Sequence, residues 1–131
     1  MPPDSPLETH DAARVWDMLR HARIITRMTT GRSPHDLKDD DQLRLALERA
    51  IEIIGEAAKQ VSKTAESEHP NIPWKKIVQQ RHIIAHDYDQ LDHTKLWSVA
   101  TTHIPPLIQQ LEAILPEPPE NPLPEAPEAT P

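Results

Sequence analysis

The sequence predicts an all-α protein, an antiparallel bundle of four main helices. Two observations support this prediction. Apolar residues recur at helical spacing in four segments, whereas the alternation typical of β-strands is almost absent. The 131 residues include only two glycines and no phenylalanine, so leucine, isoleucine, alanine and three tryptophans must form the core. We expect one helical domain at residues 1–115 with up-down connections, followed by a tail at residues 116–131.

The first helix is expected from Pro6 to about Thr30. Ser5 can cap it, Pro6 suits its first position, and Glu8 completes a capping signature. Gly31 ends it. One face of this segment is apolar and predicted to be buried: Ala12, Val15, Trp16, Leu19, Ala22 and Ile25. The signature recurs at Ser33–Asp36, but no periodicity follows there, so we predict a short turn or loop.

The second helix, starting near Asp41, has the clearest pattern. Its apolar positions are Leu43, Leu47, Ala50, Ile54, Ala57, Ala58 and Val61. Gly55 lies inside it, where glycine costs about 1 kcal/mol relative to alanine. A close helix crossing or a contact with a partner would account for that glycine.

Two further helices complete the domain. After Pro70 and Pro73, the third helix carries a stripe of Trp74, Ile77, Val78, Ile84, Ala85 and Tyr88, with Arg81 inside it. Asp92 can cap the fourth helix. Pro105 and Pro106 fall within that helix and should kink or break it near Thr102. The segment 116–131 holds seven prolines and four glutamates and is expected to be disordered.

The composition limits which cellular compartment and which classes of partner are expected. No cysteine is present, no apolar run approaches the roughly 20 residues of a membrane span, and the start of the chain does not resemble a signal peptide. A cytoplasmic protein is therefore expected. The net charge of −7 counts against a general nucleic-acid-binding surface, but four of the acidic residues lie in the tail. A local basic patch can still matter.

The segment 81–88 concentrates groups that can do chemistry, namely Arg81, His82, His86 and the only tyrosine, Tyr88. On one helix, Arg81 and His86 diverge by about 140°. A straight helix cannot aim both at one small ligand without long side-chain reach, a helix end or a second copy of the motif.

Three interpretations of this segment remain open from the residues alone. Arg81 could pair with a carboxylate while the histidines are solvated. His82 and His86, at i and i+4, could share a metal ion. Imidazole and guanidinium also suit RNA cleavage by the 2′-hydroxyl, the first for proton transfer and the second for charge on the phosphate oxygens.

The pattern Arg81-x4-His86-x-Tyr88 resembles the Arg-x4-His-x-Tyr motif of HepT-like toxins in the HEPN superfamily. Three further segments resemble that family's flanking sequence in the expected order: residues 54–58, 69–74 and 92–97. The resemblance covers roughly residues 8–115. Position 82 departs from the family, which most often has asparagine where this chain has His82.

The resemblance implies a homodimeric helical bundle and a metal-independent ribonuclease without a cofactor, the toxin of a toxin–antitoxin pair. Arg81 and His86 would be catalytic, with His82 supporting RNA binding. The antitoxin would be a minimal nucleotidyltransferase that adenylylates Tyr88. The alternative is a non-catalytic dimeric HEPN module that binds a nucleotide or a partner protein.

Overall fold

A computed structural model describes residues 7–86 and 93–115; the side chains of residues 82–86, and residues 1–6, 87–92 and 116–131, lie outside that description. The described residues form helices and turns without a β-strand, so the all-α prediction is confirmed. The helices are α1 (Thr9–Thr29), α2 (Pro34–Asp39), α3 (Asp41–Lys59), α4 (Lys63–Glu68), α5 (Trp74–His86), α6 (His93–Ser98) and α7 (Ile104–Ile114), with a π-helical turn η2 (Val99–His103) before α7.

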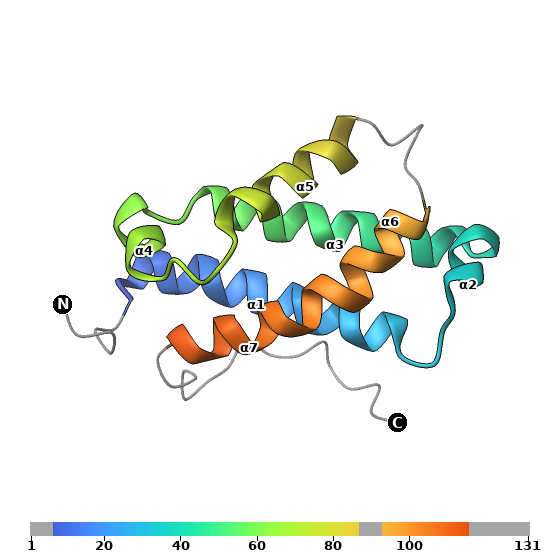
Figure 1. Ribbon diagram of the computed structural model, residues 1–131, viewed down its shortest axis with the longest axis horizontal. Coiled ribbons are helices and arrows are strands. Elements are labelled where there is room, and N and C mark those ends of the chain that lie inside the picture. The colour runs from blue at the N-terminus through green and yellow to red at the C-terminus, as the bar shows by residue number, and fades with distance from the viewer. Residues whose placement is uncertain (1–6, 87–92, 116–131) are drawn as a thin grey trace, which may run out of the picture.

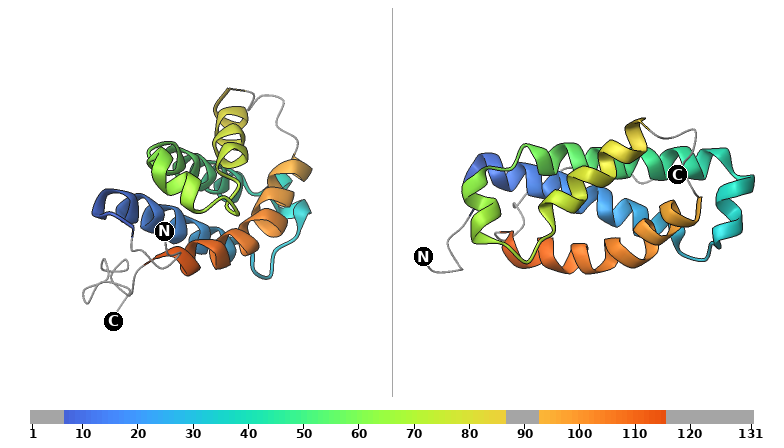
Figure 2. Two further views of the ribbon diagram at one scale, coloured as in Figure 1. Left: turned by 60° about the vertical axis from the view of Figure 1, so that its left-hand side comes forward. Right: turned by 45° about the horizontal axis from the view of Figure 1, so that its top comes forward.

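The longer helices pack side by side as the chain runs back and forth (Figure 1). Helix α1 contacts α3 on one side and α7 on the other, and α5 packs on α3. Figure 2 shows α5 crossing α3 at an angle, so that its end diverges from the rest of the molecule. The short helix α2 contacts both α3 and α6. Residues 81–86 of the motif therefore lie on the helix that packs on α3, while Asp87 and Tyr88 lie outside the described residues.

The core lies between α1, α3 and α7, with contributions from α5 and α6. Its fully buried larger side chains are Val15, Met18, Leu19, Ile25, Leu37, Leu47, Ile72, Leu96 and Leu111. The predicted face of α1 is confirmed at four of its positions, while Ala12 and Trp16 are only half-buried. Met18 is fully buried and was not predicted.

Two predictions about helix ends in the first third of the chain are wrong. Helix α1 begins at Thr9 rather than near position 6, and its N-cap Glu8 makes no side-chain cap bond; the expected cap Ser5 and Pro6 lie outside the described residues. The expected loop at Ser33–Asp36 is instead the start of α2, where the Asp36 carboxylate accepts a hydrogen bond of 2.8 Å from the Ser33 N–H. Only Leu37 is buried in this six-residue helix, so the sequence shows no periodicity.

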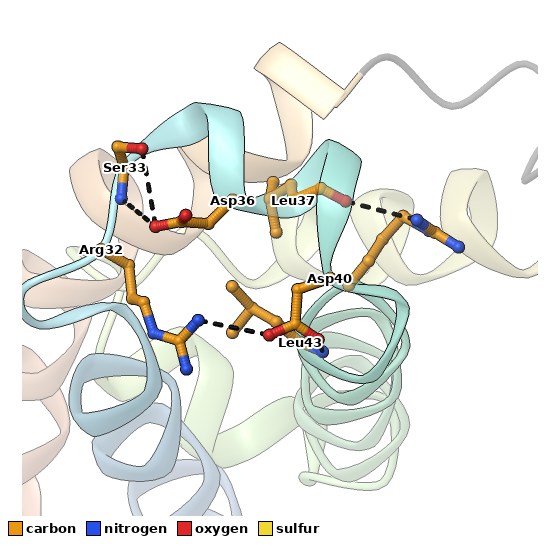
Figure 3. A network of polar contacts seen from close by, with 7 residues as sticks. Arg32, Ser33, Asp36, Leu37, Asp40 and Leu43 are labelled. Atoms are coloured by element: carbon orange, nitrogen blue, oxygen red, sulfur yellow. Dashed lines mark hydrogen bonds and ion pairs between the residues drawn. The ribbon is translucent and has the colours of Figure 1, made fainter.

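Asp40 links α2 to α3 (Figure 3). Its carboxylate accepts a hydrogen bond of 3.0 Å from the Leu43 N–H, which caps α3, and pairs with Arg32 at 3.2 Å. The hydrogen bond from Leu43 is the main reason that the pKa of Asp40 lies below its ordinary value, and Arg32 adds to it, while burial opposes the shift. The junction therefore favours the ionised carboxylate.

At the other end of the molecule, hydrogen bonds in the interior join α1 to the start of α4 and fix the segment before α5. The Asp11 carboxylate on α1 accepts hydrogen bonds from the Ser62 N–H at 2.8 Å and from the Ser62 hydroxyl at 2.7 Å. The same hydroxyl oxygen accepts the Ala65 N–H at 3.1 Å and so caps α4. Trp74 Nε1 donates to the His69 carbonyl at 3.0 Å. These bonds fix the entry into α5.

The two prolines disturb the last helical run without breaking it. In η2 the Ile104 N–H donates to the Val99 carbonyl, five residues earlier, and α7 continues with Pro105 and Pro106 in its first turn. Proline is tolerated there because its missing N–H needs no partner within the helix. The predicted irregularity is therefore a π-helical turn. Among the described helices, none is long and apolar enough to cross a membrane.

Candidate functional site

Helices α3 and α5 approach each other closely at Gly55 and Arg81. A Cβ atom placed on Gly55 would collide with Arg81 Cβ, and would lie 2.7 Å from Arg81 Cγ and 3.2 Å from the Ile77 carbonyl oxygen. Real Cβ atoms do not tolerate the first of these contacts. The close helix crossing expected at Gly55 is confirmed, and it occurs within the chain.

Arg81 is half-buried, and its Nε atom is buried without a hydrogen-bond partner among the described residues. Among the described residues, none offers it a carboxylate within ion-pair distance, so the first interpretation finds no support there. Arg14 Nε on α1 is also buried without a partner. An unpaired Nε alone therefore does not define a site, and Arg81 differs in its close contact with Gly55.

Helix α5 brings Arg81 and His86 onto one continuous element, of which His86 is the last residue. The divergence of about 140° between them therefore follows from helix geometry. The side chains of His82 and His86 lie outside the described part of the structure, and so does Tyr88. Their roles remain predictions.

Helix α5 is also a basic element in an acidic chain. Residues 74–86 include Lys75, Lys76, Arg81 and two histidines but no aspartate or glutamate. Lys75 and Lys76 are exposed. A local concentration of cations attracts an anionic ligand even when the net charge of the protein is negative. The sequence analysis missed these lysines, although the absence of acidic residues in the segment was a visible signal.

A groove of about 170 Å³ runs between α5 and the η2–α7 segment. Its floor is apolar, Lys76, Gln80 and His103 contribute polar groups to its lining, and none of the described lining residues carries a carboxylate. Within the part of the chain whose side chains are described, no three histidine, aspartate or glutamate residues come together as a metal site. The pair His82 and His86 falls outside that search.

The described part of the chain is thus an all-α domain on which the basic helix α5, with Arg81 and His86, packs against α3. The family model "Ribonuclease HepT-like" matches residues 18–114. The chain therefore belongs to the HepT-like family, as the motif and its flanking segments predicted.

Several named proteins are similar over most of their length. "Probable ribonuclease HepT" of Thermococcus cleftensis is 31% identical over 98 residues, covering 75% of this chain and 89% of that protein. "Putative RNase TTE0752" of Caldanaerobacter subterraneus subsp. tengcongensis is 32% identical over 98 residues, covering 75% and 88%. "Putative RNase MJ1380" of Methanocaldococcus jannaschii is 29% identical over 102 residues, covering 78% and 94%. No solved structure matches the chain.

Proposed function

We propose that this protein is a metal-independent ribonuclease in which Arg81 and His86 carry out the reaction. The observation that supports it best is helix α5, which joins both residues in one element that contains no carboxylate. Family membership and the ribonuclease names of the relatives point the same way. His82, between them on the same helix, would support RNA binding.

The chemistry uses the 2′-hydroxyl of the RNA as nucleophile. One His86 imidazole takes the proton from this hydroxyl, the 2′-oxygen attacks the phosphorus, and the bond to the 5′-oxygen breaks. A protonated imidazole returns a proton to the leaving 5′-oxygen, so the products are a 2′,3′-cyclic phosphate and a 5′-hydroxyl. Arg81 stabilises the negative charge that grows on the phosphate oxygens.

The divergence of Arg81 and His86 favours a homodimer. A two-fold axis beside α5 would place two copies of each residue in one cleft, with one His86 as base and the other as acid. Gly55 adds nothing to this proposal, because its space is taken by Arg81 of the same chain. Light scattering should give twice the chain mass of 14.9 kDa; a monomer at every concentration would overturn the dimer.

Cleavage by purified protein tests the proposal directly. His86→Ala should lower the rate by about 10²- to 10⁴-fold, because the proton-transfer group is lost. His35→Ala is the matched control, since His35 is an exposed histidine on α2 that pairs with Asp39. EDTA should have no effect, and loss of activity in EDTA would restore the metal interpretation of His82 and His86. A wild-type protein that binds RNA without cutting it would support the non-catalytic module.

We further propose that this ribonuclease is the toxin of a toxin–antitoxin pair. A minimal nucleotidyltransferase antitoxin would transfer adenylate from a nucleoside triphosphate to the Tyr88 hydroxyl, releasing pyrophosphate. The added phosphate would occupy the place of an RNA phosphate near Arg81 and His86.

Intact mass of the co-expressed pair tests the modification. The wild type should gain one adenylate, and Tyr88→Phe should gain none, because Tyr88 is the only tyrosine. An increment that persists in Tyr88→Phe would place the modification elsewhere. An unmodified wild type would overturn this route of neutralisation.

A further inference from the structure

The stem of Arg81 lies directly on helix α3, and Gly55 makes the room for it. A Cβ atom at position 55 would collide with Arg81 Cβ and would lie 2.7 Å from Arg81 Cγ. We propose that Gly55 is a positioning residue for Arg81, because its missing side chain lets the arginine stem rest on α3 and so fixes where the guanidinium points. This inference rests on the proposed function, since it assigns Gly55 to the reaction of Arg81.

Backbone conformation does not explain Gly55. The chain has two glycines, and among the described residues only Gly31 has a positive φ, at 76°. A Cβ at Gly31 would meet nothing within 4 Å, whereas Gly55 lies in regular helix with no room for one. Glycine is the least favourable residue in a helix interior apart from proline. Gly55 is therefore present for the space that it leaves.

A crossing that served only stability would not need an arginine opposite this glycine. Within the described part of the chain, the buried Nε atom of Arg81 has no hydrogen-bond partner, which costs free energy that an apolar side chain would not. The contact thus combines two features that each weaken the fold. Such features are retained where they hold a functional group in place.

The benefit is a cation that is ordered before the ligand arrives. Arginine has a long, flexible side chain, and ordering it costs conformational entropy. If that cost is incurred during binding or reaction, it weakens binding or slows the reaction. A donor that is already fixed needs no reorganisation when charge develops on the phosphate. Because a displacement of about 1 Å can cost about 10²-fold in rate, the position of the stem matters even though it does not touch the substrate.

The order of the Arg81 side chain can be measured in the wild-type protein. Its Nε–H group should show slow hydrogen exchange and a high NMR order parameter, because the atom is buried above a clamped stem. Arg20 and Arg27, which are exposed on α1, provide the comparison within the same chain. Arg81→Lys identifies the signal by its loss. An Arg81 signal as mobile as those of Arg20 and Arg27 would overturn the proposal.

Kinetics separate positioning from general stability. Gly55→Ala should lower kcat for RNA cleavage by about 10²-fold with a smaller change in KM. Ile25→Val is the control, because Ile25 is fully buried on α1, which packs mainly on α3 and α7, and its truncation lowers stability. In an Arg81→Ala background, Gly55→Ala should give no further loss of rate, because both changes act through one guanidinium.

The outcomes separate this inference from the proposed function. If the wild type does not cleave RNA, the proposed function fails, and the Arg81 NMR signal, compared between wild type and Gly55→Ala, still decides whether Gly55 orders Arg81. If Gly55→Ala does not fold, the wild-type signal decides alone. If Gly55→Ala lowers the rate by the same factor with and without Arg81, its effect is general and the proposal is overturned.

Discussion

Asp11 and Arg81 both place polar side-chain atoms in the interior, but these atoms differ in their hydrogen bonding. Asp11, only 5% exposed, uses both carboxylate oxygens in short hydrogen bonds to Ser62. Arg81 has a buried Nε atom without a partner. Interior polar groups are normally satisfied, and an exception calls for an explanation. The bonds of Asp11 stabilise the contact between α1 and the start of α4, although Arg14 on α1 shares with Arg81 a buried Nε that is unpaired among the described residues. What sets Arg81 apart is its stem packed on Gly55, and we infer that the α3–α5 crossing gives up some stability to keep this cation available to a ligand.

Of the three substitutions that follow from this comparison, removal of Arg81 should have the largest effect. The effect should be a lower rate of RNA cleavage. Loss of one positioned donor to a developing oxyanion costs about 10²- to 10³-fold, so Arg81→Ala should lower single-turnover cleavage by that factor. The free energy of unfolding should change by less than about 1 kcal/mol, because no hydrogen bond of Nε is lost and only packing of the stem is removed. Urea unfolding measures this second quantity.

A stability loss without a loss of rate would reverse the assignment of Arg81. It would make Arg81 a structural residue like Asp11, and the contrast between the two contacts would disappear. Arg20→Ala is the matched control, since Arg20 is an exposed arginine on α1. It should leave both quantities unchanged.

Removing Asp11 should lower the free energy of unfolding and leave the cleavage rate unchanged, the reverse of the effect expected for Arg81. Hydrogen bonds to a charged group contribute about 1.5–3 kcal/mol, so Asp11→Ala should lower the free energy of unfolding by about 2–3 kcal/mol. The Ser62 N–H would lose its acceptor, and the start of α4 would lose its link to α1. Cleavage per folded molecule should be unchanged. Glu8→Ala, an exposed position that makes no cap bond, is the control for charge near the start of α1.

The same contrast shows what the sequence could predict about the fold. The sequences of α1, α3 and α5 each contain repeating apolar positions, so these helices could be placed from periodicity. Helices α2 and α4 have six residues each and one buried apolar side chain apiece, which leaves no period to detect. The bond between Asp11 and Ser62 joins positions 51 residues apart, and nothing local in the sequence links them.

The candidate site was predictable in part. The sequence placed Arg81 and His86 on one helix, which the backbone of α5 confirms. It also marked Gly55 for a close approach, but only the packing of α5 on α3 decides between a crossing within the chain and a contact with a partner. The role of Lys75 and Lys76 depends on their exposure, which periodicity does not reveal.

Glu48 on α3 is intermediate between the fully hydrogen-bonded Asp11 and Arg81, whose Nε has no partner in the described part of the chain. Its replacement should have the smallest effect on the free energy of unfolding. Burial raises the pKa of its half-buried carboxyl, whereas Arg44 and His93 lower it and Glu52 raises it. The nearest cation contact, Arg44 Nε, is 3.9 Å away. The folded state therefore disfavours the ionised carboxylate, so the free energy of unfolding falls as the pH rises through the pKa of folded Glu48.

Glu48→Gln removes the charge and should raise the free energy of unfolding at pH 7 by about 0.5 kcal/mol or less. The difference from wild type should vanish below the ordinary pKa of 4.5, where Glu48 is protonated in both the folded and the unfolded states. Urea unfolding of both proteins at pH 7 and pH 3 measures it, with exposed Glu56→Gln as control. A Glu48→Gln protein that is less stable at pH 7 would show that attraction to Arg44 outweighs burial. Glu48 would then belong with Asp11 among the satisfied charges.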